Sequence, residues 1–181
     1  LNLVRGFIAG HDFSGLRLLM IPPLVFDASV GDVFPALSVG AALVLHPTPV
    51  DLDARELQRF CAEYRVGAID APAALLRRWT DGLIEPVLPD LRLMMFGGES
   101  VPMELVRRFS ALTGGRVALS NHYGPTEASV CATMLTTCDG SDVYGAHAAG
   151  AELPIGRPLP GVRVYLLDDA LALVPGGVTG E

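Results

Sequence analysis

Long apolar runs, clustered positive charge and a cysteine framework are all missing from this chain of 181 residues. The longest apolar stretches, such as 39–45, fall far short of the roughly 18 residues that span a bilayer. We therefore predict no membrane span. The first residues also lack the charged and apolar regions of a secretory signal, so we expect a cytoplasmic protein.

Positive charge is scarce, because 13 Lys and Arg residues stand against 20 Asp and Glu residues and form no run. A surface that binds nucleic acid needs clustered positive charge, so we expect no nucleic-acid partner. The three cysteines, Cys61, Cys131 and Cys138, have no CxxC spacing, which favours reduced thiols over a disulfide framework or a zinc site. The four histidines are too dispersed to predict a metal cluster.

The remaining composition, 50% hydrophobic and 7% aromatic, is typical of one globular core. Apolar runs and helical periodicity predict strands at 16–22, 41–45, 66–69, 91–96 and 116–120, and helices at 30–39, 54–64, 73–79 and 102–112. Ser29 and Ser100 are the candidate caps of the first and last of these helices. Strands that alternate with helices predict a mainly parallel α/β sheet flanked by helices, of the flavodoxin-like or Rossmann-like kind.

The sequence pattern changes from Pro154 onward. Segments 154–158 and 161–165 are typical of turn-linked antiparallel strands. We therefore predict an α/β subdomain over residues 1–152 and the beginning of a smaller β subdomain over 153–181.

Several polar or glycine-rich segments follow predicted strands. Asp70 ends one strand, Gly97-Gly98 follows another, and the segment 121–127, predicted to be a loop, follows a third. Phe26-Asp27 lies in a connection between a strand and a helix. Because ligands of open α/β sheets bind outside the carboxyl ends of the strands, we expect these four segments to face one crevice.

The segment Tyr123-Gly124-Pro125-Thr126-Glu127 combines groups that suit a nucleotide with Mg²⁺. The Tyr123 ring can stack on a base, Gly124 permits close approach of the backbone, the Thr126 hydroxyl can bond a phosphate oxygen, and the Glu127 carboxylate is a hard oxygen ligand. The alternative interpretation is a plain turn before a helix.

Five segments then fall in an order that resembles one family. They are Phe26-Asp27-Ala28-Ser29, Gly97-Gly98-Glu99, Asn121 to Glu127, Pro154-Ile155-Gly156-Arg157-Pro158, and Gly177-Val178-Thr179-Gly180-Glu181. Together they cover nearly the whole chain. The chain resembles the adenylation domains of nonribosomal peptide synthetases, within the larger group that includes acyl-CoA synthetases and luciferases.

This resemblance implies that an amino-acid carboxylate is activated with ATP to an aminoacyl adenylate, with release of pyrophosphate. It implies that Asp27 pairs with the α-ammonium group of the substrate, for which the alternative is a helix cap. Nucleotide contacts are implied for Gly98, Asn121, Tyr123, Gly124 and Thr126. Thr126 and Glu127 are implied to be catalytic, and Glu127 to hold Mg²⁺.

The same resemblance implies a substrate pocket formed by Asp27, Ala28, Gly31, Asp70, Met95, Gly97, His122, Val130 and Cys131. A second carboxylate at Asp70 favours a basic substrate such as ornithine, lysine or arginine, because a buried charge needs a partner. The alternative is that Asp70 caps the following helix or turn. A neutral hydrogen-bonding or aromatic substrate is the other interpretation of this pocket.

Parts of the family pattern are absent from the 181 residues: the phosphate-gripping loop, the ribose-binding Asp and the lysine of the C-terminal subdomain. We therefore expect the isolated chain to be inactive and to need the rest of the adenylation domain. A carrier-protein domain, and an MbtH-like helper protein, are the further partners that the resemblance suggests. The alternatives are a non-catalytic scaffold fragment, or a related acyl-CoA ligase for a carboxylic acid, against which Asp27 argues.

Overall fold

A single mixed sheet organises the computed structural model, which describes residues 1–84, 87–137 and 151–181. Over these residues the strand order is β2-β1-β3-β4-β5-β6-β7. The strands are β1 (Arg17–Met20), β2 (Ala42–Leu45), β3 (Ala68–Asp70), β4 (Leu93–Gly97), β5 (Ala118–Tyr123), β6 (Thr133–Thr137) and β7 (Arg157–Pro158). Neighbours from β2 to β5 are parallel, and β6 runs antiparallel to both β5 and β7. The predicted mainly parallel sheet is confirmed.

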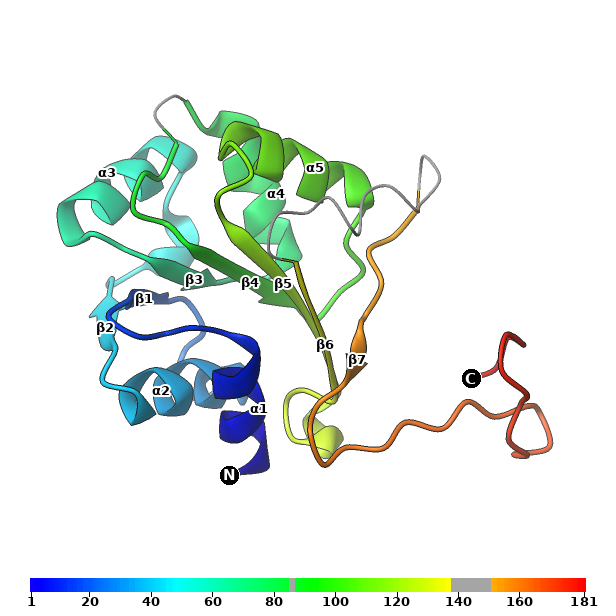
Figure 1. Cartoon of the computed structure of the whole chain (residues 1–181). Coiled ribbons are helices and arrows are strands. Elements are labelled where there is room, and N and C mark those ends of the chain that lie inside the picture. Colours follow the sequence, from blue (N-terminus) through cyan, green and yellow to red (C-terminus); the bar gives the residue numbers. More distant parts are fainter. Residues whose placement is uncertain (85–86, 138–150) are drawn as a thin grey trace.

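Helices cover both faces of the sheet, as Figure 1 shows. One face carries α3 (Ala54–Tyr64), α4 (Ala73–Gly82) and α5 (Met103–Leu112), and the other carries α1 (Asn2–Gly10) and α2 (Ala28–Ser38). Short 3₁₀ turns lie at η1 (Pro49–Asp51) and η2 (Thr126–Ala128). None of the described helices is long and apolar enough to cross a membrane.

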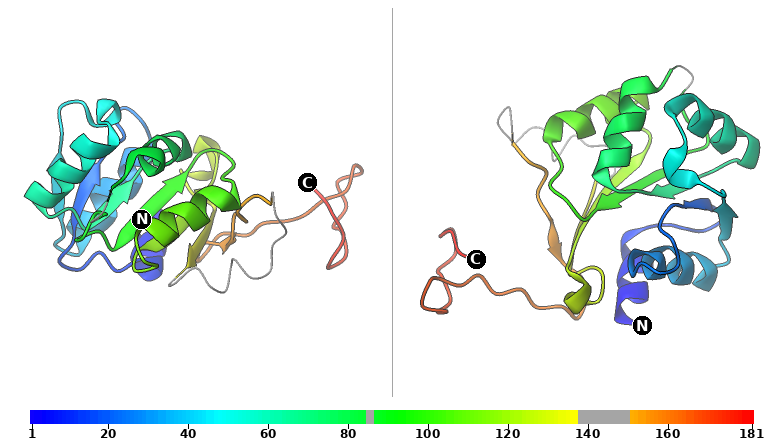
Figure 2. Two further views of the ribbon diagram at one scale, coloured as in Figure 1. Left: turned by 90° about the horizontal axis from the view of Figure 1, so that it is seen from above. Right: turned by 180° about the vertical axis from the view of Figure 1, so that it is seen from behind.

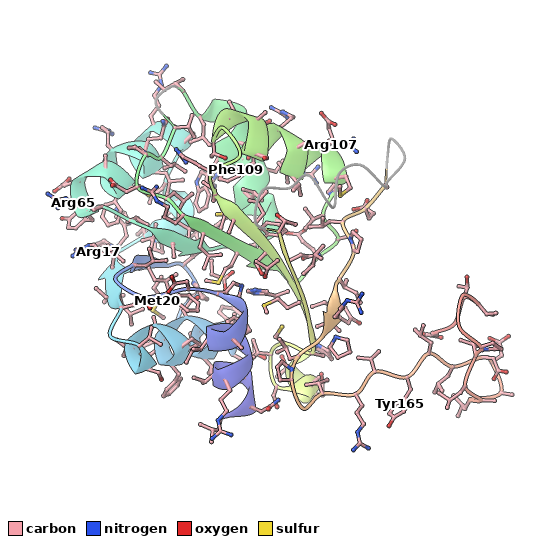
Figure 3. The ribbon with its side chains drawn as sticks, viewed as in Figure 1. Arg17, Met20, Arg65, Arg107, Phe109 and Tyr165 are labelled. Atoms are coloured by element: carbon pink, nitrogen blue, oxygen red, sulfur yellow. The ribbon has the colours of Figure 1, made fainter. Side chains whose placement is uncertain are left out.

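The core has two parts because side chains alternate across the sheet. In β4, Met94 and Phe96 join the core beneath α3, α4 and α5, whereas Leu93 and Met95 join the core beside α1 and α2. All four side chains are buried. Phe109 of α5, labelled in Figure 3, is also fully buried and belongs to the first of these two cores.

The start of α3 agrees with prediction, and the starts of α2 and α5 do not. In α3, Asp53 and Glu56 form a reciprocal capping box, with Glu56 N–H donating to Asp53 Oδ1 at 2.8 Å. The cap predicted at Ser29 is wrong, because α2 begins earlier and the Ser29 hydroxyl donates to the Phe26 carbonyl at 2.7 Å. The cap predicted at Ser100 is also wrong, because its hydroxyl donates to Glu152 Oε2 at 2.7 Å.

The segment after residue 120 was predicted to be a loop, and the structure corrects this. Asn121, His122 and Tyr123 continue β5, because β6 pairs with them in antiparallel register. Gly124 and Pro125 form the loop that follows, and Thr126 and Glu127 lie in η2. Neither β6 nor α1 was among the predicted elements.

The C-terminal segment bears out only part of its prediction. Arg157–Pro158 forms β7 and pairs antiparallel with β6, whereas residues 161–165 form no strand. Figure 2 shows this segment leaving the sheet as an extended chain, on which Tyr165 is labelled in Figure 3. The division between residues 152 and 153 stays a prediction.

Candidate functional site

A cavity of about 590 Å³ opens where β3, β4 and β5 end. Asp70 is the last residue of β3, Gly97 is the last of β4, and His122 lies next to the last residue of β5. The N-terminal part of α2 contributes Ala28 and Gly31 to the lining. Ligands of parallel sheets bind at this edge, so the cavity is the candidate substrate site.

Eight of the nine positions predicted to form the substrate pocket line this one cavity. They are Asp27, Ala28, Gly31, Asp70, Gly97, His122, Val130 and Cys131. The ninth, Met95, is fully buried in the core beside α1 and α2 and is absent from the cavity wall. The structure therefore brings together segments from 27 to 131, whereas the roles of these residues stay proposals.

The glycine pair after β4 has two separate structural reasons. A Cβ on Gly97 would lie 2.3 Å from the carbonyl oxygen of His122, so no other residue fits there without moving β5. Gly98 has a φ of 82°, which glycine adopts at little cost, and has open space beside its Cα. The cavity is therefore left unobstructed at this point.

Three carboxylates line the cavity. Glu99 Oε1 accepts from the Ala74 N–H in the first turn of α4 at 2.8 Å, whereas Asp27 and Asp70 cap no helix. Asp27 is at the N-cap position of α2, but its side chain makes no capping hydrogen bond. Asp70 precedes α4, whose N-cap residue is Pro72. Asp70 is half-buried at the cavity wall, and desolvation by its surroundings raises the pKa of its carboxyl to about 6.

Another carboxyl group, Asp32 of α2, lies behind the cavity wall beside Asp70. It is fully buried, and neither of its oxygens has a hydrogen-bond partner among the described residues. Burial raises its pKa well above the usual range, and the charge of Asp70 raises it further. The two carboxyl groups therefore favour a state in which one proton is retained between them.

His11 and His122 form a second cluster of titratable side chains at the site, and unlike the acid pair this cluster is joined by hydrogen bonds. His11 Nε2 lies 2.8 Å from Ser120 Oγ, which lies 3.0 Å from His122 Nε2 and 2.9 Å from Thr136 Oγ1. His11 Nδ1 lies 3.1 Å from the Phe7 carbonyl oxygen. Burial lowers the pKa of His11 to about 4 and that of His122 to about 3, so both rings are neutral at pH 7.

The turn that carries Val130 and Cys131 has an uncommon backbone. Ser129 and Val130 have φ values of 61° and 74°, a region that β-branched residues rarely adopt. Cys131 is buried, and its thiol donates to the Thr133 carbonyl at 3.1 Å. Burial raises the pKa of this thiol to about 11, so Cys131 acts as a neutral wall group and is no nucleophile at neutral pH.

The positions predicted to contact nucleotide divide into two groups. Gly98 and Gly124 line the cavity, whereas Tyr123, Thr126 and Glu127 are exposed outside its lining. Asn121 is buried, and its amide Nδ2 donates to the Pro154 carbonyl at 3.0 Å, which leaves its oxygen to accept a bond. Among the described residues, no group of three or more His, Cys, Asp and Glu side chains could hold a metal ion.

The family is decided by the match of the whole chain. The family model described as AMP-binding enzyme matches residues 1–181. The chain belongs to the AMP-binding enzyme family. This confirms the family resemblance that the five sequence segments indicated.

Curated relatives of this AMP-binding enzyme chain include gramicidin and bacitracin synthases. A linear gramicidin synthase of Brevibacillus parabrevis is 36% identical over 182 residues, covering 100% of this chain and 3% of that protein. Bacitracin synthase 3 of Bacillus licheniformis is 34% identical over 181 residues, which cover 99% of this chain and 3% of that protein. Novobiocin biosynthesis protein H of Streptomyces niveus is 37% identical over 166 residues, which cover 91% of this chain and 24% of that protein. The chain therefore spans a small part of each of these relatives.

Solved structures support the same fold. Holo-PA1221, described as an NRPS protein containing adenylation and PCP domains, matches with a TM-score of 0.77 and 28% identity, covering 91% of this chain and 27% of that chain. IdnL1 matches with a TM-score of 0.79 and 26% identity, covering 99% of this chain and 36% of the IdnL1 chain.

Sequence reasoning missed Asp32, His11 and Ser120 in this AMP-binding enzyme chain. A helical-wheel count identifies Asp32, because it shares a face of α2 with Ser29, Pro35 and Ala36, which are buried. No sequence signal identifies the histidine cluster, because His11 and Ser120 are 109 residues apart. Only the fold brings them together.

Proposed function

We propose that this chain is the substrate-selecting part of an adenylation domain that activates an amino-acid carboxylate with ATP for nonribosomal peptide synthesis. The observation that carries the proposal is the single cavity lined by Asp27, Asp70 and His122, next to Gly98 and Gly124. The reaction joins a carboxylate oxygen of the amino acid to the α-phosphorus of ATP and releases pyrophosphate. The family match and the relatives named as gramicidin and bacitracin synthases support this chemistry.

Asp27 is the proposed partner of the α-ammonium group. Its carboxylate is free of any capping bond and reaches the cavity from the start of α2. A charge-assisted bond from an ammonium group is stronger than a bond between neutral groups, and it orients the carboxylate of the same amino acid for reaction. This position argues against the acyl-CoA ligase alternative, because a carboxylic acid without an amino group leaves Asp27 unpaired.

The side chain of the substrate is proposed to be basic. Asp70 lines the cavity, does not cap α4, and lies beside the buried Asp32. A cationic group such as that of ornithine, lysine or arginine supplies the missing positive charge. The small residues Ala28, Gly31 and Gly97 leave room for it.

ATP and Mg²⁺ are the proposed cofactors. Tyr123 is about 51% exposed, so one face of its ring is available to stack on adenine. Glu127 is one exposed carboxylate, a donor set that fits an Mg²⁺ held mainly by phosphate oxygens and water. Thr126 is proposed to contact the phosphates, and Asn121 to accept a bond from the adenine amino group through its remaining oxygen.

The proposed partners are the remainder of the adenylation domain and a carrier-protein domain. PA1221 contains both kinds of domain according to its description, which supports the carrier assignment. The chain contains no lysine, so any lysine that the reaction uses must come from outside these 181 residues. We propose that the 181-residue chain is inactive by itself, that an MbtH-like protein is a further candidate partner, and that the parent protein is cytoplasmic.

The test replaces the matching segment of an intact relative with residues 1–181 and measures ATP–pyrophosphate exchange. Each amino acid is compared with the same molecule lacking its α-amino group. We expect exchange only with an amino acid, and Asp27→Ala should lower kcat/KM by about 30- to 100-fold, the effect of losing a charged hydrogen bond. The control is Asp90→Ala, at an exposed position away from the cavity. Equal exchange with the deaminated analogue would refute the proposal.

A further inference from the structure

The hydrogen atoms of the histidine cluster can be assigned by counting donors and acceptors. His11 Nδ1 faces the Phe7 carbonyl oxygen at 3.1 Å, and a carbonyl only accepts, so Nδ1 carries the hydrogen. Because His11 is neutral, its Nε2 is then an acceptor. The Ser120 hydroxyl, 2.8 Å away, donates its one hydrogen to this Nε2.

The remaining contacts of Ser120 must then come from donors. Its oxygen accepts from His122 Nε2 at 3.0 Å and from the Thr136 hydroxyl at 2.9 Å. The opposite assignment would leave two imidazole lone pairs facing each other, because His122 Nε2 lies 3.4 Å from His11 Nε2. One serine hydrogen cannot satisfy both nitrogens, and an unpaired buried acceptor is costly. His122 therefore carries its hydrogen on Nε2.

The other nitrogen of His122 faces the cavity. Among the described residues, the buried side-chain polar atoms without a partner are the two Asp32 oxygens and Thr137 Oγ1, so His122 Nδ1 is not enclosed. No hydrogen bond joins Nδ1 to a described residue, and His122 lines the cavity. The Phe7 ring, centred 4.6 Å from the His122 ring, restricts its rotation.

We propose that His11, Ser120 and Thr136 are positioning residues that hold His122 as its Nε2–H tautomer, so that Nδ1 presents a hydrogen-bond acceptor to the cavity. The selectivity that follows rests on the proposed function. Every polar side chain on the cavity wall is then an acceptor or is already paired: Asp27, Asp70 and Glu99 are carboxylates, and the Cys131 thiol donates to Thr133. The cavity therefore selects substrates whose side chain donates hydrogen bonds.

The tautomers are measured directly in the 181-residue chain, labelled with ¹⁵N in histidine, by long-range ¹H–¹⁵N correlation at pH 7.5. Signals are assigned with single variants of each histidine. We expect opposite tautomers in the pair, Nδ1–H for His11 and Nε2–H for His122. His46 provides a reference, because its Nδ1 accepts from the Thr48 N–H at 3.1 Å and so it should also be Nε2–H. An Nδ1–H or imidazolium form of His122 would overturn the proposal whatever the enzyme does.

Two substitutions of His11 test the positioning role. His11→Leu removes the acceptor, which frees the Ser120 hydrogen to donate to His122 and permits the other tautomer. His11→Gln retains an acceptor near the position of Nε2 and should rescue the native state. In the grafted domain we expect His11→Leu to lower the preference for a donor side chain over its non-donor isostere by about tenfold, the effect of one hydrogen bond, and His11→Gln to keep it within about threefold.

The outcomes separate this inference from the proposed function. If His11→Leu keeps the Nε2–H tautomer of His122, or leaves the substrate preference unchanged, the positioning role is wrong although the adenylation function stands. If the unmodified graft activates no amino acid, the proposed function fails. In that case the tautomers of His122 in the chain and in its His11→Leu variant still decide the claim about the network.

Discussion

Two pairs of titratable side chains stand next to the cavity, and they differ in how their polar atoms are satisfied. In each pair one member lines the cavity, Asp70 or His122, and the other is hidden behind it, Asp32 or His11. The histidine pair is neutral, and its buried nitrogens are hydrogen-bonded. The acid pair depends on the proton retained between Asp32 and Asp70, because no other described group donates to Asp32. A satisfied pair fixes geometry, whereas an unsatisfied pair destabilises the fold and so points to a ligand that completes it.

The largest effect expected from this contrast is on the pH dependence of stability. Unfolded histidines bind protons below about pH 6.5, whereas folded His11 and His122 stay neutral down to about pH 4 and pH 3. The unfolded chain therefore takes up more protons between these values, and falling pH favours it. Asp32 and Asp70 act with the opposite sign, because their raised pKa values make the folded chain retain a proton that the unfolded chain releases above about pH 4. For Asp70 this window reaches about pH 6.

Breaking the acid pair at Asp32 should reveal how strongly His11 and His122 lower stability as the pH falls. In Asp32→Asn we expect the free energy of unfolding to fall by about 2 to 3 kcal/mol between pH 7.5 and pH 5. The unmodified chain should show a shallower fall, since the two pairs oppose each other. Urea unfolding across this pH range measures both. A stability of Asp32→Asn that is flat or rises on acidification would contradict this expectation.

Breaking the histidine cluster at its centre should have the next largest effect. Ser120→Ala removes the hydroxyl that contacts His11, His122 and Thr136, and leaves buried polar groups without partners. We expect a loss of about 2 kcal/mol in the free energy of unfolding. Ser38→Ala, at the exposed end of α2, is the matched control and should change stability by less than about 0.5 kcal/mol. Equal effects of the two substitutions would show that the cluster is not a connected network.

The acid pair should respond in the opposite direction. Asp32→Asn replaces one acid of the pair with a neutral amide that can donate to the Asp70 carboxylate, so the chain should gain about 1 to 2 kcal/mol of stability at pH 7.5. Asp90→Asn at an exposed position should have no comparable effect. Chemical denaturation at pH 7.5 measures both, and a destabilised Asp32→Asn would mean that the carboxyl group has a stabilising partner.

The smallest effect on the free energy of unfolding is expected at an exposed ion pair. This pair provides a comparison with the buried polar groups. Arg108 and Asp81 are 2.8 Å apart, with side chains 50% and 57% exposed. Because water and salt screen such a pair, Asp81→Asn should cost less than about 0.5 kcal/mol. The same unfolding measurement at low and high salt checks this. A loss as large as that of Ser120→Ala would remove the distinction between exposed and buried polar groups.

The elements that sequence predicted best are those whose signals are local. Residues 54–64 were predicted as a helix, and α3 has these bounds, because its apolar spacing lies within the segment and its capping box, Asp53 with Glu56, lies at its start. In contrast, Leu1 supplies no capping side chain for α1, a helix that packs against α2 through Phe7 and Gly31. Likewise, β6 exists through its pairing with β5. Tertiary contacts of this kind leave no local signal.

The candidate site also contains residues that the sequence predicted and residues that only the fold brings together. Strand topology predicted the wall segments that follow strand ends, including Asp70 and Gly97, and the family resemblance added positions such as Gly31 and Cys131. The hidden partners Asp32 and His11 act across 38 and 109 residues of sequence, respectively, through burial and hydrogen bonds. The wrong cap at Ser29 has a similar origin, since its hydroxyl bonds backward to Phe26.

The most direct test of the central claim compares ornithine with norvaline, which has a side chain of similar length without the charge, in ATP–pyrophosphate exchange by the grafted domain. Both substrates are measured with the native pocket and with Asp70→Asn. We predict that the native pocket prefers ornithine by at least about tenfold, the effect of one charged hydrogen bond, and that Asp70→Asn abolishes the preference. A native pocket that prefers norvaline, or an ornithine preference that survives Asp70→Asn, would contradict the claim.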